Sequence, residues 1–344
     1  MYRKEFINDF SALGEELRKG LIKGSFGPDM EEAVKSSETN NSLFTKNMIL
    51  SAINNICQKY LNKEKLSGWL SRYPSVDKPL LRKCGILMAG NIPLVGFHDF
   101  LTVMAAGCSA EIKLSSKDPF LMPAISRLLS YINSNWKERI SFTDIIDKNI
   151  DCLLLTGGDQ ALSFYRKVYN GIPSLERTSR SSLAILTGKE TEKELSLLAE
   201  DIFLYYGMGC RSVSYMLLPR GYNIGKLAEA LRPMVYQLYS EDFRQAYRYQ
   251  KALLLSLGEE FIDAGFFILR QADSFPPPLG VVNYSYYTEE REIENITGNN
   301  RNLLQCIVGN YLPFCYIPFG YAQKPALEDY ADGKDSLNFL MNFM

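Results

Sequence analysis

The sequence contains a single histidine, His98, among its 344 residues. One imidazole is too few for a metal site built on several histidines, and any Ser-His-Asp or Cys-His scheme would have to use this one residue. His98 lies in a segment with helical spacing of apolar residues, where a histidine is more often a hydrogen-bonded structural side chain than a catalyst. We therefore expect no metal site and no acid-base chemistry built on histidines.

An excess of one charge, paired cysteines and long apolar runs are lacking as well. Lys and Arg number 38 and Asp and Glu 39, which argues against a nucleic-acid partner or a polybasic membrane anchor. The seven cysteines include no Cys-x-x-Cys pair, as is typical of reduced thiols in a cytoplasm. The longest apolar run, Cys84 to Phe97, is too short to span a bilayer, and Met1 to Phe10 lacks the apolar core of a secretory signal. We expect a cytoplasmic protein without a transmembrane segment.

Apolar residues are plentiful, at 46%, in a chain longer than one hydrophobic core usually supports, so two domains are expected. From Phe6 to about Leu70 the apolar residues recur at helical steps. Strand and helix patterns then alternate, which is typical of an α/β fold with a parallel sheet and ligands at the carboxyl ends of its strands. The predicted strands are 85–88, 110–114 and 151–156, and the predicted helices between them are 97–106 and 124–133.

Candidate ligand-binding residues follow each of these predicted strands. They are Asn91 after the first, Lys113, Ser115 and Ser116 at the end of the second, and the Thr156-Gly157-Gly158 turn after the third. Taken singly, each has an ordinary interpretation: asparagine before Ile-Pro and Thr-Gly-Gly are common in turns, and a lysine at a strand end is commonly solvated.

A second candidate is the stretch Tyr206-Gly-Met-Gly-Cys210-Arg211, which follows a predicted helix over 195–206 and precedes a predicted strand over 213–218. Glycine permits tight turns and close approach of the backbone to a ligand, so a cysteine after Gly-x-Gly can present its sulfur and its backbone N–H to a bound carbonyl. Taken alone, a cysteine near glycines is more often a small buried apolar residue.

Together these stretches resemble the aldehyde dehydrogenase superfamily and, within it, the acyl-CoA reductases related to the fatty-acid reductase of bacterial luminescence. The resemblance implies an aldehyde-dehydrogenase-like α/β fold, with a Rossmann-type cofactor domain and an α/β catalytic domain. We expect the NADP(H)-binding domain, with a helical N-terminal region, at 1–205 and the catalytic domain at 206–344. The resemblance covers roughly Lys83 to Gly320. Its most specific parts, in matching order, are Ala89 to Val95, Ala105 to Pro119, Leu155 to Gly158, Tyr206 to Arg211 and Pro318 to Gly320.

The resemblance also implies a reaction, the reduction of a fatty, long-chain acyl-CoA to the aldehyde with NADPH. Cys210 matches the family nucleophile, whose thiolate attacks the thioester carbonyl. The side-chain amide of Asn91 and the backbone N–H of Cys210 then hold the oxyanion. Coenzyme A leaves, and the covalent acyl-cysteine is reduced by hydride from the nicotinamide.

Cofactor contacts are implied for Lys113, Ser115, Ser116 and the turn 156–158. The family sets a lysine at the position of Lys113 against the adenosine ribose, and its NAD-preferring members often carry an acidic residue three positions later. Ser116 stands there instead, so no carboxylate repels a 2'-phosphate, and Lys117 adds a cation nearby. These residues favour NADPH. The turn 156–158 resembles the one at which a helix N-terminus faces the pyrophosphate.

Departures from the family leave alternatives open. Glu176 lies near the position of the family's water-activating glutamate, but Arg177-Thr178-Ser179 replaces the expected glycine pair, so we interpret it as a surface carboxylate. Pro276 to Leu279 occupies the neighbourhood of a second family glutamate, which seats the nicotinamide ribose.

One alternative function is that of an aldehyde dehydrogenase running in the oxidative direction. The other is a catalytically silent homologue that binds an acyl-activating ligase. Delivery of the acyl group by a carrier protein, and assembly into an oligomer, also stay open.

Overall fold

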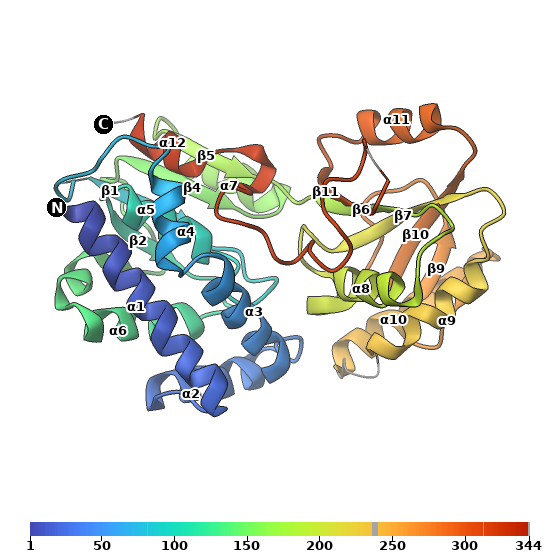
Figure 1. The fold of residues 1–344 in the computed structure, drawn as a ribbon, viewed down its shortest axis with the longest axis horizontal. Coiled ribbons are helices and arrows are strands. Elements are labelled where there is room, and N and C mark those ends of the chain that lie inside the picture. The colour runs from blue at the N-terminus through green and yellow to red at the C-terminus, as the bar shows by residue number, and fades with distance from the viewer. Residues whose placement is uncertain (81, 236–239, 312, 343–344) are drawn as a thin grey trace. The chain divides into compact units, whose positions relative to one another are not determined.

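The computed structural model describes residues 1–344 except 81, 236–239, 312 and 343–344, and only the backbone of 233–235. The chain forms two compact units (Figure 1). Unit 1 comprises Met1–Thr178 and Pro325–Met344, and unit 2 comprises Ser179–Lys324. The predicted boundary after residue 205 differs from this division. Residues 179–205 belong to unit 2 because the strand at 181–185 pairs within that unit's sheet.

Four helices open unit 1, as the helical spacing between Phe6 and Leu70 predicts. Side chains cap two of them: Thr45 accepts from the Met48 N–H, and Asn62 accepts from the N–H groups of Glu64 and Lys65. The helices are α1 (Tyr2–Lys23), α2 (Pro28–Asn40), α3 (Lys46–Lys59) and α4 (Lys63–Leu70).

The sheet of unit 1 is parallel, in the order β3-β2-β1-β4-β5. Its three central strands match the predicted ones to within two residues, whereas the short edge strands β3 and β5 were not predicted. The strands are β1 (Lys83–Leu87), β2 (Ser109–Lys113), β3 (Ile140–Phe142), β4 (Cys152–Thr156) and β5 (Ser174–Arg177). The remaining helical elements of the unit are α5 (Phe97–Ala105), α6 (Leu121–Ile132), η1 (Ser134–Arg139), α7 (Asp159–Val168), η3 (Ala331–Gly333) and α12 (Ser336–Met341).

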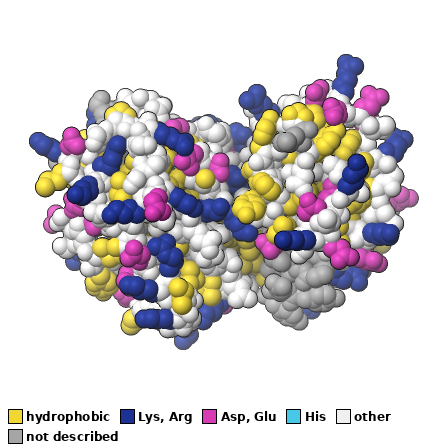
Figure 2. All heavy atoms as spheres, in the orientation of Figure 1, with side chains coloured by type: hydrophobic (Ala, Val, Ile, Leu, Met, Phe, Trp, Pro, Cys, Tyr) yellow, Lys and Arg dark blue, Asp and Glu magenta, His cyan; other side chains and the backbone are white. Residues whose placement is uncertain are grey.

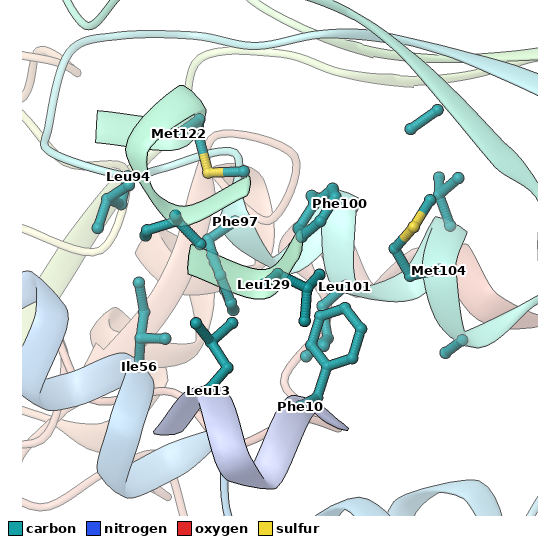
Figure 3. Packing of buried hydrophobic residues seen from close by; sticks show 14 of the residues in the cluster. Phe10, Leu13, Ile56, Leu94, Phe97, Phe100, Leu101, Met104, Met122 and Leu129 are labelled. Carbon is teal, nitrogen blue, oxygen red and sulfur yellow. The ribbon is translucent and has the colours of Figure 1, made fainter. Parts of the chain in front are cut away.

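The main core of unit 1 lies between helices and one face of this sheet. Phe10 and Leu13 of α1 meet Phe97 and Phe100 of α5 (Figure 3), and all four side chains are fully or almost fully buried. Burying a side chain of this size stabilises the fold by about 1.5–3 kcal/mol. On the other face of the sheet, Leu162 of α7 packs against apolar side chains of β4. This packing fixes α5 and α7, the two helices that follow the loop of Asn91 and the 156–158 turn.

Unit 2 contains a second sheet, in the order β11-β6-β7-β10-β9-β8, in which only β8 runs antiparallel to its neighbour among the described strands. Helices α8 and α9 cover one face and α11 covers the other (Figure 1). The strands are β6 (Ser181–Ile185), β7 (Val213–Pro219), β8 (Ile262–Asp263), β9 (Ile268–Gln271), β10 (Val281–Tyr287) and β11 (Leu304–Val308). The helical elements are α8 (Glu192–Phe203), η2 (Leu204–Gly207), α9 (Ile224–Val235), α10 (Glu241–Leu257) and α11 (Glu290–Asn299).

Helix α8 ends at Phe203, three residues before the end predicted for the helix over 195–206. Leu204 follows in a non-helical conformation, and Tyr205 and Tyr206 after it have φ angles of 58° and 55°, which lie in the left-handed region and cannot continue a right-handed helix. Both tyrosine side chains are buried, so the apolar pattern continues after the helix has ended.

Among the described residues, no helix is both long enough and apolar enough to cross a membrane. The face shown in Figure 2 carries Lys and Arg side chains interspersed with Asp and Glu side chains, in keeping with the near balance of charge in the sequence.

Candidate active site

Three candidate loops of unit 1 start at the same edge of the sheet. Strand β1 lies between β2 and β4, and Leu87 at its end is in register with Lys113 of β2 and Leu155 of β4. The segments carrying Asn91, Ser115–Ser116 and the 156–158 turn therefore leave the sheet side by side. The topology places these positions as the strand pattern predicts, while their roles stay predictions.

The loop carrying Asn91 is held in shape by its neighbours. A Cβ atom on Gly90 would lie 2.6 Å from Cβ and Oγ of Ser115, so only glycine lets this loop lie against the end of β2. The backbone N–H of Met88 donates to the Lys113 carbonyl at 3.0 Å, and the N–H of Leu94 donates to Oδ2 of Asp118 at 2.9 Å. These contacts fix both sides of Asn91.

Asp118 is a supporting residue that sequence reasoning missed. It lies inside the segment Ala105 to Pro119, which resembles the family, but an aspartate before proline is common in ordinary turns. Its carboxyl is buried, which raises its pKa to about 6, although hydrogen bonds from the backbone N–H groups of Leu94 and Leu121 oppose this shift.

The end of β2 leaves the expected ribose contacts accessible. Lys113 is half-buried, whereas Ser116 and Lys117 are exposed. The Ser115 hydroxyl accepts from the Lys117 N–H at 3.2 Å, and the Ser116 carbonyl accepts from the Asn40 side chain at 3.0 Å. The backbone of this loop is thus pinned while the Ser116 side chain stays exposed.

The 156–158 turn leads directly into α7. The Gly157 N–H donates to the Arg177 carbonyl at 3.3 Å, and Gly158 is the N-cap residue immediately before the helix begins at Asp159. A Cβ atom on Gly157 would meet only the Ala161 Cβ, at an ordinary 3.5 Å. Packing within the protein therefore leaves room for a larger residue at 157. A glycine at this position instead suits close approach of a ligand to the backbone.

A buried ion pair below this turn was missed by the sequence analysis. Nη1 of Arg177 lies 2.5 Å from Oδ1 of Asp99, and Oδ2 of Asp99 lies 3.4 Å from Oγ1 of Thr156. Both charged side chains are at least nine-tenths buried. Asp99 thereby connects α5 to the ends of β4 and β5. Its position in the first turn of a helix gave no signal of this role, because acidic residues are common there.

His98 has the structural role expected of it. Its Nε2 atom lies 2.9 Å from the carbonyl oxygen of Leu327, and its ring contacts the aromatic rings of Tyr60, Trp69 and Tyr330. Burial lowers its pKa, which favours the neutral imidazole.

Glu176 lies on the edge strand β5 and is bound by arginine. Its Oε2 atom accepts from Nε of Arg166 at 2.7 Å and lies 2.5 Å from Nη2 of the same guanidinium. The side chain is 18% exposed, so it is more buried than the predicted surface carboxylate. The Glu176 carboxylate therefore forms an ion pair with an arginine of α7.

In unit 2, Cys210 lies on a closed turn between η2 and β7. The Ser212 N–H donates to the Gly209 carbonyl at 2.9 Å, and the Gly209 N–H donates to the Ser212 hydroxyl at 3.2 Å. The fully buried Ser182 hydroxyl donates to the Cys210 carbonyl at 2.9 Å. Ser182 was missed by the sequence analysis because a serine in an apolar strand is not distinctive.

All seven cysteines lie in the described part of the chain; six are buried, and Cys210 is partly exposed. Burial raises the pKa of the Cys57 and Cys108 thiols to about 12 and that of Cys315 to about 11. Buried thiols of this kind are poor nucleophiles, because the thiolate is the reactive form. Exposure therefore singles out Cys210 as the candidate nucleophile, although Asn91 belongs to unit 1 and its pairing with the Cys210 N–H stays a prediction.

Comparison with known proteins supports the fold. Aldehyde dehydrogenase 21 from Physcomitrella patens, in complex with the reaction product succinate, matches 99% of this chain and 83% of its own, with a TM-score of 0.67 and 12% identity. Betaine aldehyde dehydrogenase from Staphylococcus aureus, in complex with NAD+, matches 89% of this chain and 70% of its own, with a TM-score of 0.65 and 13% identity.

Aldehyde dehydrogenase C from Pseudomonas syringae, as a mutant in complex with NAD+ and octanal, matches 90% of this chain and 72% of its own, with a TM-score of 0.65 and 11% identity. These similarities confirm the predicted aldehyde-dehydrogenase-like α/β fold. No protein-family model matches the sequence, and no curated protein matches it.

Proposed function

We propose that this chain is an acyl-CoA reductase that forms a covalent acyl-cysteine at Cys210 and uses NADPH to release a fatty aldehyde. The observation that carries the proposal is the exposure of Cys210 on a closed turn, while the six other thiols are buried. The order of the resembling segments and the aldehyde-dehydrogenase-like fold support the same assignment.

In this proposal the Cys210 thiolate attacks the thioester carbonyl carbon, and the carbonyl electron pair moves onto oxygen. The side-chain amide of Asn91 and the Cys210 N–H donate hydrogen bonds to that oxygen. The bond from the carbonyl carbon to the coenzyme A sulfur then breaks, and the acyl group remains on Cys210. Once that acyl group has gained a hydride, the carbon–sulfur bond to Cys210 breaks, which frees the aldehyde and restores the thiolate.

The carboxyl edge of the unit 1 sheet fits a dinucleotide. A helix N-terminus follows the 156–158 turn, Gly157 leaves its backbone open to approach, and Ser116 and Lys117 are exposed beside Lys113. Bound there, NADPH would supply the hydride. Ser115 contributes by fixing the loop, because its hydroxyl accepts from the Lys117 N–H.

Two alternatives remain candidates. Aldehyde oxidation is favoured by the similar structures, which are aldehyde dehydrogenases, one of them in complex with octanal. Against it stands the engagement of Glu176 with Arg166, because oxidation needs a carboxylate free to activate water. A silent homologue that binds an acyl-activating ligase would show neither activity.

The direct test mixes the protein with NADPH and a long-chain acyl-CoA and follows the loss of nicotinamide absorbance together with aldehyde formation. The same protein with NADP+ or NAD+ and a fatty aldehyde tests oxidation. Turnover only in the second mixture contradicts the proposal and supports an aldehyde dehydrogenase. No turnover in either mixture supports the silent homologue.

A Glu176→Gln variant is expected to keep acyl-CoA reduction within about threefold of the unchanged protein, because a carboxylate that is not a base contributes little to the barrier. Arg166→Gln is the matched control, since it breaks the same ion pair and leaves the carboxylate in place. Steady-state rates of both variants give the answer. If Glu176→Gln collapses the rate while Arg166→Gln does not, Glu176 is a general base after all.

The protein is expected to use NADPH with a higher kcat/KM than NADH. A Ser116→Glu variant is expected to lose about tenfold or more in kcat/KM with NADPH, roughly 1.4 kcal/mol, through repulsion between the new carboxylate and the 2'-phosphate. Ser116→Gln, of nearly equal size but uncharged, separates charge from bulk. The phosphate argument fails if Ser116→Glu keeps the original preference.

A further inference from the structure

We propose that Asp201 is a positioning residue for Cys210. In this inference, the carboxylate of Asp201 holds the loop 320–323 in the conformation in which that loop braces the Cys210 turn. The inference deepens the proposed function, since it rests on Cys210 being the nucleophile.

Asp201 lies near the end of α8 and is 1% exposed. Its Oδ2 atom accepts from the Gly320 N–H at 2.6 Å, and its Oδ1 atom accepts from the Ala322 N–H at 2.9 Å. One side chain of the helix therefore binds two backbone groups of a loop 119 and 121 residues away along the chain. One carboxyl group thus fixes the loop at two points, and such bonds are strongest while that group is ionised.

The same loop then contacts the two residues that follow Cys210, Arg211 and Ser212. Nε of Arg211 donates to the Ala322 carbonyl at 2.5 Å. Gln323 is the next residue of the loop, and its Nε2 atom donates at 2.8 Å to the Ser212 hydroxyl. The same hydroxyl also accepts from the Gly209 N–H. Arg211 and Ser212 are thus bound directly to a loop whose conformation depends on Asp201, and Gly209 is connected to it through the Ser212 hydroxyl.

The loop also lies tightly against the helix that carries Asp201. Gly320 has a φ of 82°, and a Cβ atom there would lie 2.7 Å from Cδ2 of Leu197 on α8. Glycine is required on both counts. In this inference, the Pro318-Phe319-Gly320 motif brings the loop against α8, where the Gly320 N–H reaches the Asp201 carboxylate.

A buried carboxylate is a costly way to hold a loop. Burial raises the pKa of Asp201 to about 7 against the opposing effect of the two backbone N–H groups. Well-packed apolar residues stabilise a core at least as well as buried charges do. A role in orienting the Cys210 turn accounts for a charged residue at this position.

Asp201→Asn is the variant to test, because it keeps the shape of the side chain but replaces one acceptor oxygen by an N–H₂ donor. Hydrogen exchange of the backbone amides is measured first. Exchange within 320–322 and within 209–212 is expected to accelerate at least about tenfold, since the bonds to a charged acceptor are lost.

Glu200→Gln is the matched control. Glu200 is the neighbouring acid on α8, and its carboxylate lies 3.4 Å from Lys324, outside the chain of contacts to Cys210. It is expected to leave the exchange of 209–212 unchanged.

Kinetics provide the second measurement. Asp201→Asn is expected to lower kcat for acyl-CoA reduction about tenfold and to leave KM for acyl-CoA and NADPH unchanged, because a displaced nucleophile affects the chemical step. Acceleration confined to 320–322, with unchanged exchange at 209–212, overturns the inference. So does an unchanged kcat in a protein that reduces acyl-CoA. If the unchanged protein reduces no acyl-CoA, the proposed function fails, while accelerated exchange at 209–212 still supports the brace.

Gln323→Leu covers the case in which Asp201→Asn does not fold. It removes the donor to Ser212 and leaves both bonds of Asp201 intact. Exchange is then expected to accelerate at 209–212 but not at 320–322. Unchanged exchange at 209–212 in this variant contradicts the contact route from the loop to the Cys210 turn.

Discussion

A Cys210→Ala variant is expected to lose at least about 10⁴-fold in the rate of acyl-CoA reduction, the scale seen when the nucleophile of a covalent mechanism is removed. The reason is structural: the six other cysteines are buried, so none is presented to a substrate. Cofactor binding is expected to survive, since the predicted NADPH contacts belong to unit 1. Steady-state rates and the fluorescence of bound NADPH measure the two quantities separately.

Mass spectrometry gives the same prediction a direct readout. Incubated with an acyl-CoA in the absence of NADPH, the unchanged protein is expected to gain the mass of one acyl group, and Cys210→Ala is expected to gain none. Cys57→Ala is the control, because it removes a fully buried thiol of unit 1 and leaves Cys210 in place. Turnover that persists in Cys210→Ala, or acylation at another residue, rules out the mechanism.

An Asn91→Ala variant is expected to lose about 10²–10³-fold in kcat, with little change in KM, because an oxyanion donor acts in the transition state rather than on the bound substrate. The loop itself is expected to keep its shape, since Gly90 and Leu94 hold it through contacts that do not involve the Asn91 side chain. Asn91→Asp, nearly identical in shape but without the amide donor, should show a loss at least as large.

A small effect would have a clear meaning. If kcat of Asn91→Ala stays within about threefold of the unchanged protein, Asn91 is the turn residue that its position before Ile-Pro also allows. The oxyanion would then depend on other donors, and the Cys210 result would stand unaffected.

The fold could be predicted where the hydrophobic pattern is strong and local. Strand β4 is an apolar run, and β1 and β2 are short segments that each follow or precede a glycine- or serine-containing turn; the sequence predicts each of the three to within two residues. Strand β5 was missed because it has only four residues, two of them the charged Glu176 and Arg177. Arg177 is buried through its pairing with Asp99, a contact 78 residues apart that no local pattern reveals.

The division into units depends on the same kind of distant contact. Strand β6 pairs with β7 on one side and with β11, more than a hundred residues later, on the other. A boundary drawn from the position of Cys210 therefore fell inside unit 2. The candidate site divides in the same way. Cys210 and its glycines form a local motif that the sequence shows directly. Asp201 binds the Gly320 N–H and Ser182 binds the Cys210 carbonyl, and only folding brings these distant residues together.

The left-handed run at Tyr205, Tyr206 and Gly207 limits how this protein could be stabilised by design. Non-glycine residues held at positive φ cost about 1–3 kcal/mol each, so a glycine at 205 or 206 would seem an easy gain in thermal tolerance. Both rings are buried, however, and deleting a buried aromatic side chain costs about 3–5 kcal/mol. Varying either tyrosine singly is therefore expected to yield mostly less stable proteins. A stabilising change there requires joint redesign of the left-handed segment and of the residues that pack against its two rings.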